Sequence, residues 1–170
     1  MTKSDYERLA HDMVSRIEIV NSLDSARPNI LQVRVDGRHA VLKMGIADSL
    51  CKELSVLERT VDSKHTPVLF DSFKTDGHIG ILREFIEGKC LEFGERLNPE
   101  QYSSLRESVR YLHAEGIYGL DIYPGNILMT PEGRPRLFDF NTCDVCIRDS
   151  SSRYRMSWDW ELINILRGDN

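Results

Sequence analysis

The sequence predicts an α+β fold in which a β-rich first half is followed by a helix-rich second half. Short runs of alternating apolar and polar residues dominate the chain before residue 86, as half-buried strands require. Two Asp-Gly pairs, at 36–37 and 76–77, separate such runs and are typical of tight hairpins. Apolar residues after residue 98 recur at helical spacing instead. Strands and helices segregated in this way predict two subdomains with a crevice between them.

The first part of the chain predicts a helix and then three antiparallel strands. Tyr6, Leu9 and Met13 lie near one face of the helix, and apolar residues alternate with polar ones afterwards. The segment 24–29 (DSARPN) and the Asp-Gly pair at 36–37 provide the turns between the strands. Gly45 is expected to end the third strand. The expected bounds are 3–15 for the helix and 17–23, 30–35 and 38–44 for the strands.

A second helix and two further strands complete the β-rich half. Leu50, Leu54 and Leu57 have helical spacing and predict a helix over 47–60. Strands over 67–74 and 78–86 are expected on either side of the second Asp-Gly turn.

The helix-rich half begins at Asn98-Pro99, because Pro is favoured at the first helical position. Leu105 and Val109 share one side of the expected helix. The remaining expected elements are a helix over 99–115, a small hairpin of 127–129 with 136–140, and an apolar helix over 158–166 with Trp158 and Trp160 in the core.

Composition indicates one globular domain and argues against two classes of partner. The chain has 170 residues, 41% hydrophobic and 29% charged, which suits one domain with its own core. A net charge of -5 lacks the basic excess typical of phosphate-backbone binders, so no nucleic-acid partner is expected. No apolar run approaches the roughly 18 residues that a membrane helix needs, so no membrane span is expected. The polar start of the chain lacks the apolar centre of a secretion signal.

Two neighbouring segments carry the chemistry. In residues 117–128 (IYGLDIYPGNIL), Asp121 is followed five positions later by Asn126. In residues 137–141 (LFDFN), Asp139 stands alone among apolar residues, where a carboxylate is costly unless it is paired or binds a metal. These segments resemble the catalytic loop and the D-F-G element of the protein kinase superfamily.

The resemblance implies a division of labour for phosphoryl transfer, which needs charge neutralisation and alignment. Asp121 would be the catalytic base for the attacking hydroxyl. Asn126 and Asp139 would hold Mg²⁺, which prefers oxygen ligands, and Asp139 would link the metal to the phosphates. Residues 41–43 (VLK) resemble the family's V-A-I-K strand, so Lys43 would contact the phosphates as a further catalytic residue. Glu53 on the following helix would pair with Lys43.

The resemblance also implies the remaining parts of a nucleotide cleft. Residues 81–88 (ILREFIEG) look like the hinge between lobes, where backbone groups around Glu84, Phe85 and Ile86 would bind adenine, with Arg83 at the back of the pocket. Asp159 would anchor the catalytic loop. The implied fold is one kinase-like domain over 1–170, in which 1–86 form the N-lobe, with the N-terminal helix, a five-stranded antiparallel sheet and one helix. Residues 87–170 would form a small, mainly helical and truncated C-lobe.

The expected activity is an ATP- and Mg²⁺-dependent transfer of the γ-phosphate to a hydroxyl, favouring a protein Ser or Thr, with a small-molecule acceptor as an alternative. A pseudokinase acting as a binding module is a further alternative, because the turn over 21–29 has no glycine to cover the phosphates and the D-F-G glycine is Asn141. Asn tolerates left-handed backbone angles, so that turn could survive. Transfer of the AMP moiety of the nucleotide is a weaker alternative, because it would need a flipped nucleotide and no feature of the sequence indicates one.

The cysteines indicate a reducing compartment. Cys51, Cys90, Cys143 and Cys146 show no pattern of a small secreted domain, so the cytoplasm is expected, or a host cytosol if the protein is an effector. The single C-x-x-C pair, 143–146, offers too few ligands for a structural zinc site and is interpreted as two ordinary thiols.

Overall fold

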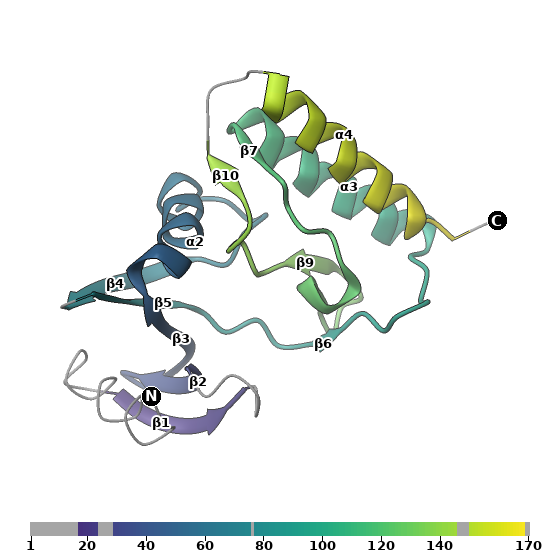
Figure 1. Cartoon of the computed structure of the whole chain (residues 1–170). Coiled ribbons are helices and arrows are strands. Elements are labelled where there is room, and N and C mark those ends of the chain that lie inside the picture. Colours follow the sequence, from purple (N-terminus) through teal and green to yellow (C-terminus); the bar gives the residue numbers. More distant parts are fainter. Residues whose placement is uncertain (1–16, 24–28, 76, 146–149, 169–170) are drawn as a thin grey trace.

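The computed structural model describes residues 17–23, 29–75, 77–145 and 150–168. The expected helix over 3–15, most of the turn over 24–29 and Cys146 lie outside the described residues. The first half forms an antiparallel sheet of five strands in the order β1-β2-β3-β5-β4 (Figure 1). The strands are β1 (Ile17–Ser22), β2 (Ile30–Val35), β3 (Arg38–Ile46), β4 (Leu69–Thr75) and β5 (His78–Glu84).

The turn between β2 and β3 follows the prediction from its sequence. Asp36 and Gly37 have φ angles of 48° and 80°, so both are left-handed, as a two-residue hairpin of the favoured type requires. The prediction that Gly45 ends β3 is wrong. β3 continues through Gly45 to Ile46 because its pairing with β5 extends as far as His78.

Alternation along β3 places Lys43 on the face of the sheet opposite the one that carries Leu42 and Met44. Leu42 and Met44 are fully buried in a small apolar cluster on one face of the sheet. Val41 and Lys43 therefore point to the opposite face, because successive strand residues alternate. Helix α2 (Ala47–Arg59) packs against this opposite face of the sheet. The buried side of the helix carries Leu50, Glu53, Leu54, Val56 and Leu57.

The second half is built on two helices that lie side by side, α3 (Pro99–Ala114) and α4 (Ser150–Ile165) (Figure 1). Asn98 caps α3 reciprocally with Gln101, so the helix begins where the sequence predicts. α4 begins earlier than expected, at Ser150, and Trp158 is half-exposed rather than a core residue. The reason is that Asp159 and Ile163 occupy the buried face of α4, which turns Trp158 outward.

Short strands join these helices to the sheet. β6 (Lys89–Cys90), β8 (Ile127–Met129) and β9 (Pro135–Leu137) form a three-stranded sheet, and β7 (Ile117–Tyr118) pairs with β10 (Asp144–Val145). The predicted hairpin of β8 and β9 is confirmed, although β9 ends at Leu137. One turn of 3-10 helix, η1 (Pro124–Asn126), precedes β8.

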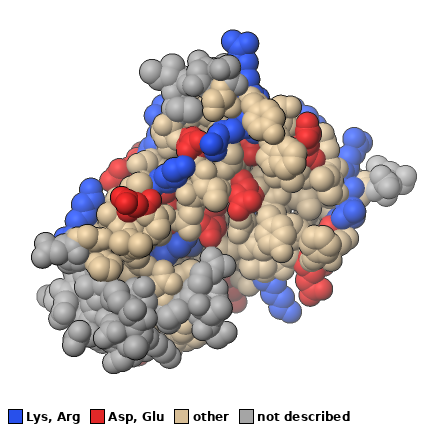
Figure 2. Space-filling model, viewed as in Figure 1, with Lys and Arg blue, Asp and Glu red and all other residues tan. Residues whose placement is uncertain are grey.

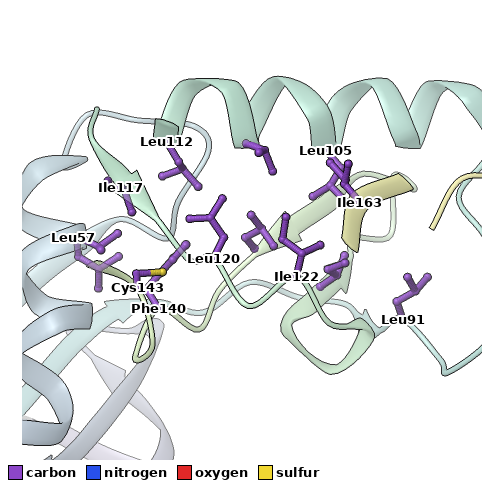
Figure 3. Packing of buried hydrophobic residues seen from close by; sticks show 14 of the residues in the cluster. Leu57, Leu91, Leu105, Leu112, Ile117, Leu120, Ile122, Phe140, Cys143 and Ile163 are labelled. Carbon is purple, nitrogen blue, oxygen red and sulfur yellow. The ribbon is translucent and has the colours of Figure 1, made fainter. Parts of the chain in front are cut away.

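A continuous core lies beneath the loop that follows β7. Leu120 and Ile122 point into this core together with residues of α2, α3 and α4 (Figure 3). Asp121, between them, is exposed, so its apolar neighbours anchor the loop while Asp121 itself lies at the surface. Phe140 is fully buried beside the same cluster, so the segment around Asp139 is anchored in the same way.

The described helices include none that is long and apolar enough to cross a lipid bilayer. On the face shown in Figure 2, acidic and basic side chains of the described residues are interspersed. This face therefore carries no extended area of a single charge.

Candidate active site

A cleft of about 360 Å³ lies where the sheet meets the second half of the chain. Its volume falls within the range of small-molecule sites. Lining residues come from the sheet, from the segment after β5, and from the loop and strands after β7. They are Leu23, Ile30, Val41, Lys43, Arg83, Phe85, Ile86, Gly88, Cys90, Gly125, Asn126, Leu128, Phe138 and Asp139.

Lys43 lies between two carboxylates at the inner end of the cleft. Its Nζ is 2.6 Å from Glu53 Oε2 and 3.1 Å from Asp139 Oδ1. Glu53 is fully buried and Lys43 nearly so, which makes these interactions strong compared with surface pairs. The structure thus brings together three of the predicted residues from β3, α2 and the segment after β9.

Asp121 has an unusual backbone. Its φ of 48° lies in the left-handed region, which a non-glycine residue adopts at an energetic cost and which is often found at functional sites. Asn126 Nδ2 donates hydrogen bonds to Asp121 Oδ2 at 3.0 Å and to Asp121 O at 3.1 Å. The predicted base and the predicted metal ligand are therefore in direct contact, although only Asn126 lines the cleft.

Hydrogen bonds to Asp159 of α4 fix the loop that carries Asp121. Asp159 is fully buried, and its carboxylate accepts hydrogen bonds from Leu120 N at 2.8 Å and Gly119 N at 3.0 Å. His113 Nε2 lies 2.9 Å from the same carboxylate. Asp159 thus occupies the anchoring position that the sequence predicts for it.

The predicted hinge residues divide into two groups. Phe85 and Ile86 line the cleft, whereas Glu84 does not. Glu84 N donates to Val68 O at 2.8 Å, and the Glu84 carboxylate pairs with Arg136 at 3.2 Å. The Glu84 N–H is therefore used to hold the hinge in place.

Asn141 does not use the left-handed conformation that the sequence suggests for it. Among the described residues, the non-glycine positions with positive φ are Asp36 and Asp121. Asn141 N instead donates to Asp139 Oδ1 at 3.4 Å, so the turn forms with ordinary backbone angles.

Sequence reasoning missed the ion pair made by Arg83. This residue is 5% exposed, and its Nε lies 3.4 Å from Glu53 Oε1. Its guanidinium also lies 6.0 Å from the centre of the Phe138 ring. A single cation in the otherwise apolar run of β5 was the signal that could have revealed it.

The donor set fits magnesium with a bound polyphosphate. No cluster of three or more His, Cys, Asp or Glu residues is placed to hold a metal in the described part of the chain. Mg²⁺ is usually held by one or two protein oxygens and by substrate phosphates. Asp139 and Asn126 both line the cleft and carry such oxygens, and the Lys43 ammonium, a cation suited to phosphate, lies 3.1 Å from Asp139 Oδ1.

The cysteines lie at different depths. Among the described residues, Cys51, Cys90 and Cys143 are free thiols. Burial raises the pKa of the Cys143 thiol strongly, and nearby carboxylates, led by Asp159, add to the effect. Cys143 is therefore a neutral packing residue. Cys90 is exposed and lines the cleft.

The chain is similar in sequence to protein kinases. The chain is 26% identical over 143 residues to a probable cAMP-dependent protein kinase catalytic subunit of Encephalitozoon cuniculi, a match covering 79% of the chain and 44% of the relative. It is 31% identical over 126 residues to the serine/threonine-protein kinase PAK 4 of Mus musculus, covering 67% of the chain and 21% of the relative. The chain thus spans less than half the length of these curated relatives. No family model matches it.

The fold is similar to that of a solved kinase structure. The structure of the PK-1 kinase of Cydia pomonella granulovirus superimposes with a TM-score of 0.72, covering 95% of this chain and 70% of that one at 18% sequence identity. The ordered residues from Lys43 to Asp159 and the two-lobe α+β fold lead to the same conclusion. The chain belongs to the protein kinase-like superfamily.

Proposed function

We propose that the protein transfers the γ-phosphate of ATP to a hydroxyl, with Mg²⁺ bound at Asn126 and Asp139. The observation that carries the proposal is the position of Lys43, whose ammonium lies between Glu53 and Asp139 at the inner end of the cleft. A cation held in this way is oriented toward a phosphate chain before that chain arrives. Mg²⁺ would supply charge neutralisation on the phosphate oxygens.

Each side chain would have one task. Lys43 would bind non-bridging phosphate oxygens through its ammonium. Glu53 would hold Lys43 in its orientation from the buried side of α2. Asp121 would accept the proton of the attacking hydroxyl, and Asn126 would keep the Asp121 carboxylate in one orientation through the 3.0 Å hydrogen bond. Phe85 and Ile86 would contact the base of the nucleotide.

A Ser or Thr hydroxyl of a protein is the proposed acceptor. The support is that several curated relatives, including the PAK 4 kinase of Mus musculus, are named as serine/threonine kinases. The exposed position of Asp121 also suits an acceptor that approaches from outside the cleft. A small-molecule hydroxyl would require the same chemistry at Asp121.

The test is Mg²⁺-dependent ATP binding by calorimetry, followed by phosphate transfer to a library of Ser-, Thr- and Tyr-containing peptides. Lys43→Met and Asp139→Asn should weaken binding by about tenfold or more, because the first removes the cation that would bind the phosphates and the second removes a charged ligand of Mg²⁺. Asp121→Asn should keep binding and lose transfer. Lys74→Met and Asp71→Asn, at exposed positions on β4, are matched controls that should leave both unchanged.

The outcomes separate the alternatives. Absence of binding at millimolar Mg²⁺-ATP would contradict the proposal. Binding without transfer to any peptide or small-molecule alcohol, and without ATP hydrolysis that Asp121→Asn reduces, would identify a binding module rather than an enzyme.

A further inference from the structure

The buried carboxylate of Glu53 faces two cations. Lys43 Nζ lies 2.6 Å from Oε2, and Arg83 Nε lies 3.4 Å from Oε1. Glu53 is 0% exposed, Lys43 4% and Arg83 5%. A carboxylate this deeply buried requires compensating charge, so the number of cations around it matters.

The register of the sheet explains why both cations reach the same carboxylate. On β3 and β5, Val41 pairs with Arg83, and Lys43 pairs with Ile81. Lys43 and Arg83 therefore point to the same face of the sheet from neighbouring strands. That face is covered by α2, which carries Glu53.

The two ion pairs differ in geometry. Lys43 donates a hydrogen bond to Glu53. Glu53 Oε1 and Arg83 Nε, in contrast, have no hydrogen-bond partner among the described residues, although they lie close together. Arg83 is thus held by charge and by the Phe138 ring, while Glu53 keeps one acceptor available to it.

Lys43 has competing partners. It pairs with both Glu53 and Asp139, and in the proposed function it also has to bind phosphate. The single charge of Lys43 is therefore shared among several negative groups. If this shared cation were the only counter-ion of the buried Glu53 carboxylate, the carboxylate would be incompletely compensated and would hold Lys43 less firmly.

We propose that Arg83 is a positioning residue, a second counter-ion that compensates the buried Glu53 carboxylate, so that Glu53 keeps Lys43 in place while Lys43 binds phosphate. This inference rests on the proposed function and adds a residue to it. Arg83 acts through Glu53 and Lys43. Loss of Arg83 should therefore reduce nucleotide affinity and turnover only while the Glu53 carboxylate is present.

The experiment measures the Kd for Mg²⁺-ATP and the phosphate-transfer rate in a double-mutant cycle of Arg83→Met and Glu53→Gln. Arg83→Met alone should raise the Kd by about tenfold, because one of two counter-ions of a buried acid is lost. Arg83→Lys keeps the charge and should restore most of the affinity. Once Glu53→Gln has removed the acid, Arg83→Met should change the Kd by less than about twofold.

Arg34→Met is the control for the loss of a cation. It removes one cation from an exposed pair with Glu18 and should leave the Kd for Mg²⁺-ATP unchanged. If Arg83→Met alone does not fold, Arg83→Gln, which also removes the charge but keeps a polar side chain, takes its place in the cycle. An unchanged Kd in Arg83→Met, or an equal loss in both backgrounds, would overturn the role of Arg83 while leaving the proposed function intact. A wild-type protein that binds no nucleotide would overturn both.

Discussion

Leu120 N donates a hydrogen bond of 2.8 Å to Asp159 Oδ1, so the last described helix fixes the residue directly before Asp121. The same carboxylate accepts a hydrogen bond from Gly119 N and lies 2.9 Å from His113 Nε2. Because Asp159 is 0% exposed, its carboxylate cannot exchange these partners for water. The position of the proposed base thus depends on a residue of α4.

Replacing Asp159 with Asn should lower both stability and activity. The substitution exchanges one acceptor oxygen for a donor that would face an N–H group, which should reduce the free energy of unfolding by about 2–3 kcal/mol. The transfer rate should fall more than the affinity for ATP, because Asp121 moves while the cleft stays. Urea unfolding and steady-state kinetics measure the two effects. Glu58→Gln, at an exposed position of α2, is the control, and an equal loss in both variants would contradict this role.

Much of the fold could be predicted because local chemistry decides it. The β2–β3 hairpin and the start of α3 depend on a few residues whose backbone preferences are strong, such as Asp36-Gly37 and Asn98-Pro99. The end of β3 could not be predicted from Gly45, since pairing with β5 overrides the preference of one residue. The prediction that Trp158 lies in the core was wrong for a similar reason, because tertiary packing decides which face of α4 is buried.

The candidate site could be predicted where spacing carries the chemistry. Asp121 and Asn126 lie on one loop, so their contact follows from five positions of separation. The cation in the apolar run of β5 marks Arg83 as unusual, but its partner Glu53 lies on α2, and no local pattern identifies a partner in another element. Long-range pairs of this kind become visible only when the register of the sheet is known.

Gly88 should be the most sensitive glycine of the cleft. Its φ is 154°, and an added Cβ would collide with Leu128 Cδ2 and with Met129 O. Gly94 has a φ of 92° but open space around it, so Gly94→Ala should cost about 1–2 kcal/mol from strain alone. Gly88→Ala should cost about 1–3 kcal/mol more because of overpacking. Equal unfolding midpoints in urea for the two variants would rule out this explanation.

Asp144 should couple α2 to α4 in a salt-sensitive way. Its carboxylate lies 2.6 Å from Lys52 Nζ on α2 and 2.8 Å from Arg155 Nη1 on α4. These side chains are partly exposed, so Asp144→Asn should cost no more than about 1 kcal/mol of stability. Because Lys52 adjoins Glu53, activity should fall more clearly than stability. High salt should lower the activity of the wild-type protein to nearly that of Asp144→Asn, because it screens the two ion pairs. If Asp144→Asn is as active as the wild-type protein in low salt, the coupling is refuted.

His65 should make stability depend on pH. Burial lowers the pKa of His65 below its ordinary value of 6.5; Glu107 opposes this, and Lys64 and Arg136 add to it. The unfolded chain therefore binds a proton more readily than the folded one. The stabilisation is complete above pH 6.5 and is lost as the pH falls through the lower, folded value. Urea unfolding between about pH 8 and pH 5 should show a slope that His65→Asn reduces. The exposed His39→Asn should retain the slope, and an unchanged slope in His65→Asn would exclude this residue as its source.

Cys90 should report occupancy of the cleft. It is an exposed free thiol that lines the cleft, whereas Cys51 is an exposed free thiol on α2, outside the cleft lining. Mg²⁺-ATP should therefore slow alkylation of Cys90 by iodoacetamide and leave Cys51 unaffected, as mass spectrometry of the modified peptides can measure. Burial raises the pKa of Cys90, so the reaction should speed up as the pH rises and the thiolate forms. Cys143, which is fully buried, should react only after unfolding. Equal protection of Cys90 and Cys51 would indicate a general stabilisation of the protein instead of a nucleotide bound beside Cys90.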